Sequence, residues 1–389
     1  YGGTETNFSH RFNGNALAEI VKDTFFFDAS AARFQGIVDP ERSYSFGNLP
    51  RSNNRTDITR FDLRPYLRQQ FGDDGLVFLS YQYGELWYDD NDTQDSKRHV
   101  ATANIGDWDR NSGFTWRANY NYTKVEYDVS NDFEYQIAYG ELGLWVTRYA
   151  RIFGAYGLET DYEDLDSSEL SDQSWEAGFE FEPNNRMRLL LAAGERSWGS
   201  TYRGTFRYEV QRFTTDISYN ETPYTPGLDG YARLPFPDED DPDDSLDRPG
   251  AGGRYVFKRF QWRTTYDLPK SSWTFRVFQG KKDNIILDED SDIDPDELGN
   301  EESRGASLRW HWDAGSRTMV SILGQFAHRK FADIEREDDI WRVRAEVEYE
   351  LGPRTYANVA SQSSKQEPDS NEDSGYTATT IGLWIRRTF

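Results

Sequence analysis

The chain has 389 residues, no cysteine, and 68 acidic against 44 basic side chains, for a formal net charge of -24. The lack of cysteine excludes disulfides, thiol nucleophiles and cysteine-ligated metals, and the acidic balance argues against a nucleic-acid partner, because phosphate contacts need clustered lysine and arginine. Apolar residues make up only 36%, which is typical of disorder, but aromatic residues reach 16%, which indicates a folded chain.

Short segments with alternating apolar and polar side chains recur along the whole chain. A period of two places the two sets on opposite faces of a sheet. The clearest runs are 114–122, 175–181, 202–210 and 341–349. Low apolar content together with many aromatic residues fits an all-β fold, a transmembrane antiparallel β-barrel with lipid outside and water inside. We expect about 18–20 strands in a single barrel that covers residues 1–389.

The connections between these segments alternate between short and long. The short ones are tight-turn sequences, such as Gly72-Asp73-Asp74-Gly75 and Pro269-Lys270-Ser271. The long ones are polar and acidic, above all residues 223–253 and 283–303. This asymmetry is typical of bacterial outer-membrane barrels, in which short turns are periplasmic and long loops are extracellular. It predicts a multi-pass protein of a Gram-negative outer membrane, in contact with lipid and lipopolysaccharide.

The last expected strand runs from about Gly375 to Phe389. Its apolar face resembles the membrane-insertion signal at the end of outer-membrane barrels, although Arg387 departs from that pattern. The residues of this signal are Ile381, Leu383, Ile385 and Phe389. If Phe389 is periplasmic, counting back gives about nineteen strands, whereas bacterial single-chain barrels have even numbers. We expect one or three N-terminal strands to be missing from this chain; a merged first hairpin, giving eighteen strands, is the alternative.

Four segments carry a resemblance to a known family: 15–30, 58–71, 193–202 (AGERSWGSTY) and 218–221. They resemble the outer-membrane β-barrel proteins associated with the PEP-CTERM exosortase system and exopolysaccharide gene clusters. Ser197 and Ser200 depart from that family's pattern, which has an aromatic residue and Asn there. The resemblance covers most of residues 5–225. It implies a barrel with further upstream strands and a role in exporting or anchoring an extracellular polymer.

Arginines dominate the polar positions of the strands. Alternation assigns fourteen of them to the lumen: Arg60, Arg64, Arg68, Arg117, Arg188, Arg196, Arg203, Arg207, Arg259, Arg263, Arg276, Arg309, Arg342 and Arg344. A wall of guanidinium groups favours anions. In the alternative interpretation, the arginines form a structural lattice with nearby carboxylates. The carboxylates in question are Asp62, Asp216, Glu176, Glu180, Glu209, Glu346 and Glu348.

The acidic loops suggest at most loose calcium binding. Asp288, Asp290 and Asp292 have the spacing of the first ligands of an EF-hand, but Ile293 occupies the position that needs glycine. Nothing in the sequence predicts a cofactor, and the four scattered histidines have no spacing that is typical of a catalytic site. We therefore expect a protein without enzymatic activity.

The leading hypothesis is a porin-like channel for the export or passage of an anionic exopolysaccharide, with an acidic polysaccharide as solute. An alternative is a structural barrel that anchors or sheathes a periplasmic or extracellular protein partner, such as a secreted fibre, a lipoprotein or a cytochrome. A third is an outer-membrane enzyme, which would need a close His–carboxylate or Ser–His pair in one cleft.

Overall fold

The structure is a computed structural model that describes residues 12–37, 55–72, 74–89, 95–107, 113–128, 132–160, 170–224, 254–286, 301–331, 336–368 and 375–387. In this part of the chain, nineteen antiparallel strands form one sheet. The predicted fold class and strand number are confirmed. Across the same residues, no helix is long and apolar enough to span a bilayer.

Long strands account for almost all of the described residues. The first ten are β1 (Phe12–Val21), β2 (Phe25–Ile37), β3 (Arg55–Phe71), β4 (Gly75–Tyr88), β5 (Ser96–Asp107), β6 (Phe114–Tyr127), β7 (Phe133–Thr147), β8 (Ala150–Thr160), β9 (Leu170–Asn184) and β10 (Met187–Arg196). The other nine are β11 (Gly199–Val210), β12 (Phe213–Tyr224), β13 (Arg254–Leu268), β14 (Ser271–Ile286), β15 (Glu301–Asp313), β16 (Thr318–Phe331), β17 (Arg336–Gly352), β18 (Thr355–Pro368) and β19 (Tyr376–Arg387).

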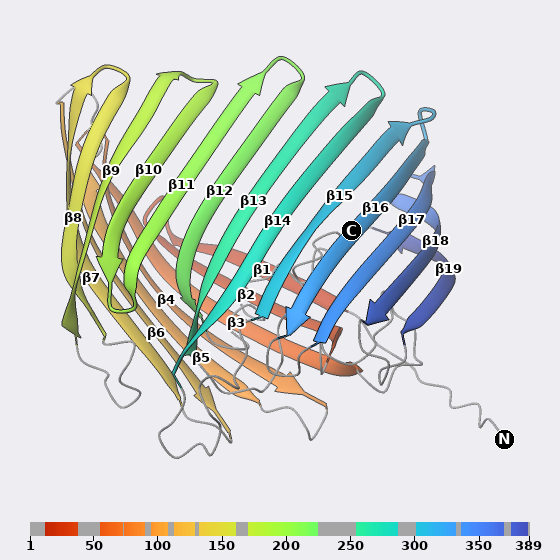
Figure 1. Cartoon of the computed structure of the whole chain (residues 1–389), viewed down its shortest axis with the longest axis horizontal. Coiled ribbons are helices and arrows are strands. Elements are labelled where there is room, and N and C mark those ends of the chain that lie inside the picture. The colour runs from red at the N-terminus through yellow and green to blue at the C-terminus, as the bar shows by residue number, and fades with distance from the viewer. Residues whose placement is uncertain are drawn as a thin grey trace.

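The strands form a meander in which each one pairs with its neighbours in sequence, from β1–β2 to β18–β19. The sheet curls so that β2–β6 lie behind β11–β17 (Figure 1). Because the number of antiparallel strands is odd, β1 and β19 run in the same direction. Among the described residues no registered pair joins these two strands, so the sheet is curved like a barrel wall but not closed by their direct pairing.

The two faces of the sheet differ in chemistry as the alternation predicts. On β7, Leu142, Leu144 and Val146 are more than half exposed, whereas Glu141, which precedes them on the opposite face, is buried. On β17, Trp341 and Val343 are exposed, and Arg342 between them is buried. Exposed apolar and buried polar side chains are the reverse of the distribution in a water-soluble domain and match a sheet with a lipid-facing outer surface.

The polar face is the concave one. Arg151 on β8 contacts side chains on both β6 and β9, and Arg196 on β10 contacts side chains on β7 and β8. Side chains converge over several strands only on the inside of a curve, where neighbours also cover one another. The polar face is therefore the inner wall, and the apolar face is the perimeter.

The C-terminal strand follows the same rule. Ile381, Leu383 and Ile385 are 80%, 78% and 68% exposed on the outer face of β19. Phe389, the last member of the predicted insertion signal, lies outside the described residues, as do residues 1–11 and the calcium candidates Asp288, Asp290 and Asp292. Their expected roles remain predictions.

The tight turns between the described strands lie at one end of the sheet, which we call the short-turn end, and we call the opposite end the long-loop end (Figure 1). Two further short turns, at 148–149 and 211–212, are not among the turns that the sequence predicts, and they also lie at the short-turn end. One connection departs from the pattern, because only Ser197 and Trp198 join β10 to β11 at the long-loop end. This turn requires Gly199, whose φ of 100° is rarely adopted by other residues.

Candidate functional site

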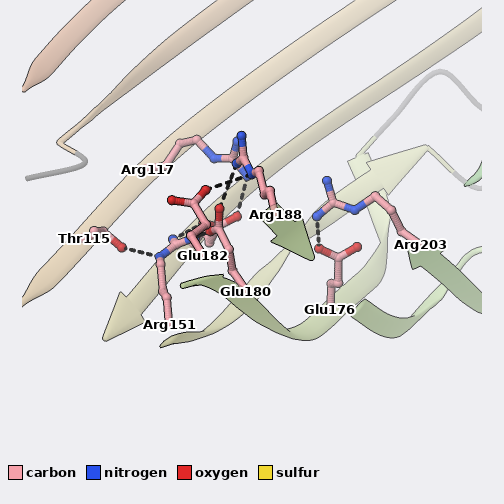
Figure 2. Close-up of polar contacts among 9 residues, drawn as sticks. Thr115, Arg117, Arg151, Glu176, Glu180, Glu182, Arg188 and Arg203 are labelled. Atoms are coloured by element: carbon pink, nitrogen blue, oxygen red, sulfur yellow. Dashed lines mark hydrogen bonds and ion pairs between the residues drawn. The ribbon is translucent and has the colours of Figure 1, made fainter. Parts of the chain in front are cut away.

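A cluster of arginine and glutamate side chains covers the inner wall from β6 to β11, towards the short-turn end (Figure 2). All its members lie on the concave face, because each occupies one of the alternate positions of its strand whose side chains point to that face. They are Thr115 and Arg117 on β6, Glu141 on β7, Arg151 on β8, Glu176, Glu180 and Glu182 on β9, Arg188 on β10 and Arg203 on β11.

Arg151 is the buried centre of this cluster. Its guanidinium donates to Glu141 at 2.5 Å, to Glu180 at 3.2 Å and to the hydroxyl of Thr115 at 2.9 Å. To reach β6 it passes over β7 at Gly143, where a Cβ atom would stand 2.5 Å from Arg151 Nε and 2.6 Å from the Thr115 oxygen. A glycine at this position is therefore what allows one guanidinium to bridge four strands.

More exposed arginines cap the buried carboxylates. Arg188 donates to Glu180 at 2.8 Å and pairs with Glu182 at 3.0 Å, and Arg117 pairs with Glu141. The Arg188 side chain is 59% exposed and that of Glu180 only 7%; for Arg117 and Glu141 the values are 26% and 4%. The cluster therefore presents guanidinium groups to the lumen although its four arginines and four glutamates balance in formal charge.

A cavity of about 340 Å³ opens among these side chains. Its wall combines charged groups with the apolar surfaces of an indole, a phenyl ring and a leucine. The residues lining it are Thr115, Arg117, Glu141, Trp145, Arg151, Phe153, Glu180, Glu182, Arg188, Leu190 and Arg203.

A row of arginines continues from the cavity across the sheet at one level of the strand register. Each member is the cross-strand partner of the next position, from β10 to β17. The order is Arg188, Arg207, Asp216, Arg263, Arg276, Ser307, Gln325 and Arg342. We call its five basic members the arginine row. Neighbouring strands lie only about 5 Å apart. The row is therefore a basic track from Arg188 to Arg276 with a single carboxylate, Asp216, and the uncharged Ser307 and Gln325 separate this track from Arg342.

The remaining sequence-predicted arginines are distributed over the inner wall without forming one site. Arg60 pairs with Asp62 at 3.0 Å, Arg64 with Asp28 at 2.7 Å, Arg344 with Glu346 at 2.9 Å and Arg203 with Glu176 at 2.6 Å, while Arg342 donates to Gln362 at 3.0 Å. Arg68 opposes Phe78, Arg309 opposes Thr274, and Arg259 lies 6.0 Å from the ring centre of Phe257.

The carboxylates of the lattice interpretation all form ion pairs with basic side chains. Besides the pairs above, Arg207 lies 3.3 Å from Glu209 and 3.5 Å from Asp216, and Arg386 lies 2.7 Å from Glu348. The lattice is thus present, and it coexists with exposed guanidinium groups.

A second polar centre lies at the long-loop end of the same wall. Glu159, which is fully buried, accepts hydrogen bonds from the Tyr135 hydroxyl at 2.7 Å, from Arg196 Nε at 2.7 Å and from the backbone N–H of Ser197. Arg196 also lies 4.5 Å from the ring centre of Trp198. These contacts hold the β10–β11 turn against β7 and β8, and they involve several residues of the 193–202 segment.

The same turn narrows the long-loop end of the lumen. Trp198 packs against a buried cluster in which Val125, Phe133 and Tyr135 of β6–β7 meet Val256 of β13. Val256 alternates in phase with Trp262, which is on the outer face, and no bulge intervenes between them. The long-loop end of β13 therefore leans inward over the short β10–β11 turn.

Sequence reasoning missed several residues of the inner wall. Arg151, Glu141, Trp145 and Phe153 were detectable in principle, since the alternation of β7 and β8 places them on the polar face. Glu159 sits at the predicted start of a long loop, and so no face can be assigned to it from the sequence.

No family model and no curated protein matches the chain. Solved structures do resemble it. The siderophore receptor PirA from Pseudomonas aeruginosa superimposes with a TM-score of 0.52 at 12% identity, covering 97% of this chain and 69% of the receptor. A ferric enterobactin receptor, PfeA, in complex with BCV-L6 gives 0.54 at 10% identity, covering 97% and 70%. The copper transporter OprC gives 0.51 at 11% identity, covering 96% and 69%.

These structures are outer-membrane β-barrels, and the chain has their fold. At such low identity the likeness extends to the architecture alone. The resemblance to exosortase-associated proteins is untested by these comparisons and remains a prediction.

Proposed function

We propose that the protein is a porin-like channel of a bacterial outer membrane that passes anionic solutes, with its short-turn end in the periplasm and its long-loop end outside. The arginine row carries this proposal. Five guanidinium groups and one carboxylate follow one another across the inner wall along the hydrogen-bonding direction of the sheet. Because the strands of a barrel are tilted to its axis, such a row climbs along the wall, and a passing anion meets its members in succession.

The ion-pair lattice supports anion preference rather than opposing it. In the cluster near the short-turn end the carboxylate is buried behind its arginine, as in Arg188–Glu180 and Arg117–Glu141. The nearer charge dominates the field that a solute experiences, because Coulomb energy falls with distance and with screening.

We further propose that the natural solute is an acidic exopolysaccharide. Support comes from the length of the basic track, which suits a polyanion better than a small ion, and from the family resemblance. No site for catalysis is part of this proposal.

The test is ion selectivity in planar bilayers containing the refolded chain. We expect a reversal potential that reports anion preference in a KCl gradient. The double substitution Arg207→Gln/Arg263→Gln should lower the anion-to-cation permeability ratio by about two- to fivefold, since one unit charge at about 4 Å contributes about 1 kcal/mol in water. Arg148→Gln, in the exposed β7–β8 turn, is the matched control and should change nothing. A cation-preferring pore or a closed barrel would contradict the proposal.

A further inference from the structure

We propose that the cavity between β6 and β11 is a binding site for one carboxylate-bearing sugar ring, a hexuronate unit of an acidic polysaccharide. This inference rests on the proposed passage of such a polymer and names the point where the wall holds it. With a volume of about 340 Å³, the cavity lies at the lower end of small-ligand sites, which span roughly 300–1,000 Å³.

The charge accessible in the cavity selects a carboxylate. Four arginines and three glutamates line it, but Glu141 and Glu180 are buried and bonded to Arg151. The groups that reach the lumen are three guanidiniums and one carboxylate, Glu182, which is 23% exposed. A guanidinium fork matches a carboxylate in shape as well as in charge.

The arginines retain hydrogen-bonding capacity beyond the lattice. Arg117 and Arg203 each donate through Nη2 to one glutamate. The Nε groups of both are buried and have no acceptor among the described residues. A guanidinium offers five N–H donors. The ion pairs therefore orient these side chains without saturating them.

The apolar part of the wall selects a ring. Trp145, Phe153 and Leu190 line the cavity beside the arginines, and an ion-pair lattice alone has no need of them. Aromatic faces carry partial negative charge and attract the C–H face of a pyranose. Phe153 is fixed in place because it lies over Gly178, where a Cβ atom would come within 2.3 Å of its ring.

The remaining carboxylate serves the sugar hydroxyls. Glu182 is held by Arg188 at 3.0 Å and, as an ionised carboxylate, only accepts hydrogen bonds. A hexuronate brings all three complements at once: a carboxylate for the arginines, hydroxyls for Glu182 and an apolar ring face for Trp145. An inorganic anion or a small carboxylic acid lacks the last two.

The test is equilibrium binding of radiolabelled glucuronate to the detergent-solubilised, refolded chain. Glucose, acetate and glucose 6-phosphate serve as competitors. We expect glucuronate to compete at least about tenfold better than glucose, which lacks the charge-assisted fork, and than acetate, which lacks the ring. Stronger competition by acetate would mean a nonspecific anion site, and stronger competition by glucose 6-phosphate would mean a phosphate site; either overturns the proposal.

Two substitutions locate the binding. Arg188→Gln and Trp145→Leu should each weaken glucuronate binding by about tenfold. Arg386→Gln is the matched control for the first, because Arg386 on β19 is similarly exposed, at 53%, and also pairs with a less exposed glutamate, Glu348, but lies outside the cavity and the arginine row. Trp175→Leu, on the outer face of β9, is the control for the second. If Trp145→Leu fails to fold, Arg188→Gln decides alone.

The outcomes separate this site from the channel. An anion-preferring pore whose glucuronate binding is absent, or is unchanged in Arg188→Gln, overturns the site and leaves the proposed function intact. Binding that depends on Arg188 in a chain that forms no open pore supports the site and contradicts transport.

Discussion

The two polar centres of the β6–β11 wall use the same ion pairs for different purposes. At the long-loop end, Glu159 is fully buried and Arg196 is 21% exposed, so both partners are largely removed from water. At the short-turn end, Glu180 is buried but Arg188 is more than half exposed. The depth of the arginine therefore distinguishes a contact that holds the wall together from one that offers charge to a solute.

The same wall shows how a barrel wall keeps a rigid frame while presenting a charged surface. The buried carboxylates fix the arginines, and the arginines cover the carboxylates. A buried ion pair often contributes little net stability, yet removing one partner is costly because the other is left uncompensated. Substitutions at the two centres should accordingly separate stability from selectivity.

The largest effect on stability is expected from Glu159→Gln. The change removes the charge that faces Arg196 and weakens three hydrogen bonds, so the free energy of unfolding should fall by about 3–5 kcal/mol. Urea-induced unfolding of the chain in lipid vesicles, followed by tryptophan fluorescence, measures it. Glu209→Gln is the control, since Glu209 is 56% exposed beside Arg207 and its loss should cost less than about 1 kcal/mol. Equal losses in the two variants would contradict the distinction by depth.

Gly143→Ala should have the next largest effect. The added methyl group would collide with the Arg151 guanidinium and the Thr115 hydroxyl, forcing them apart at a cost of about 1–3 kcal/mol. Gly140→Ala, on the same strand, is the matched control, because no atom lies within 4 Å of the position of its Cβ. The same unfolding assay measures the effect. If Gly143→Ala leaves the free energy of unfolding unchanged, the Arg151 side chain does not need to cross β7.

Trp198→Ala tests the narrowing at the long-loop end. Loss of the indole from the cluster around Val256 should cost about 1–2 kcal/mol, less than for a fully buried tryptophan, and should raise single-channel conductance by widening that end. Trp175→Ala on the outer face should leave conductance unchanged. An unaltered conductance in Trp198→Ala would place the narrowest part of the lumen elsewhere.

Much of the fold follows from the sequence because each strand encodes its own faces. The alternation in 114–122 and 341–349 predicts which side chains face inward, and the turn sequences predict the short-turn end. The details of the wall do not follow, since they depend on contacts between strands that are not neighbours. Arg151 reaches Thr115 only because Gly143 is between them, and Tyr135 meets Arg196 across 61 residues of chain.

The inward lean of β13 is the clearest case of this limit. Period two assigns Val256 to the outer face with Trp262, and the register agrees. Val256 is nevertheless buried against β6–β7, because the β10–β11 turn is short and leaves room for the end of β13 to bend over it. The length of one turn thus changes the environment of a residue three strands away.

Arg188→Gln should cause the smallest change in stability of these variants together with a clear change in ion selectivity. Its side chain is more than half exposed, so its ion pairs with Glu180 and Glu182 contribute less than about 1 kcal/mol to folding. The substitution nevertheless removes the first charge of the arginine row and exposes two carboxylates to the lumen. The reversal potential in a KCl gradient should therefore shift towards cation permeability while the urea midpoint stays nearly constant. A variant that loses stability but keeps its ion selectivity would show that Arg188 stabilises the wall and does not attract solutes. The two polar centres would then differ in their location but not in their role.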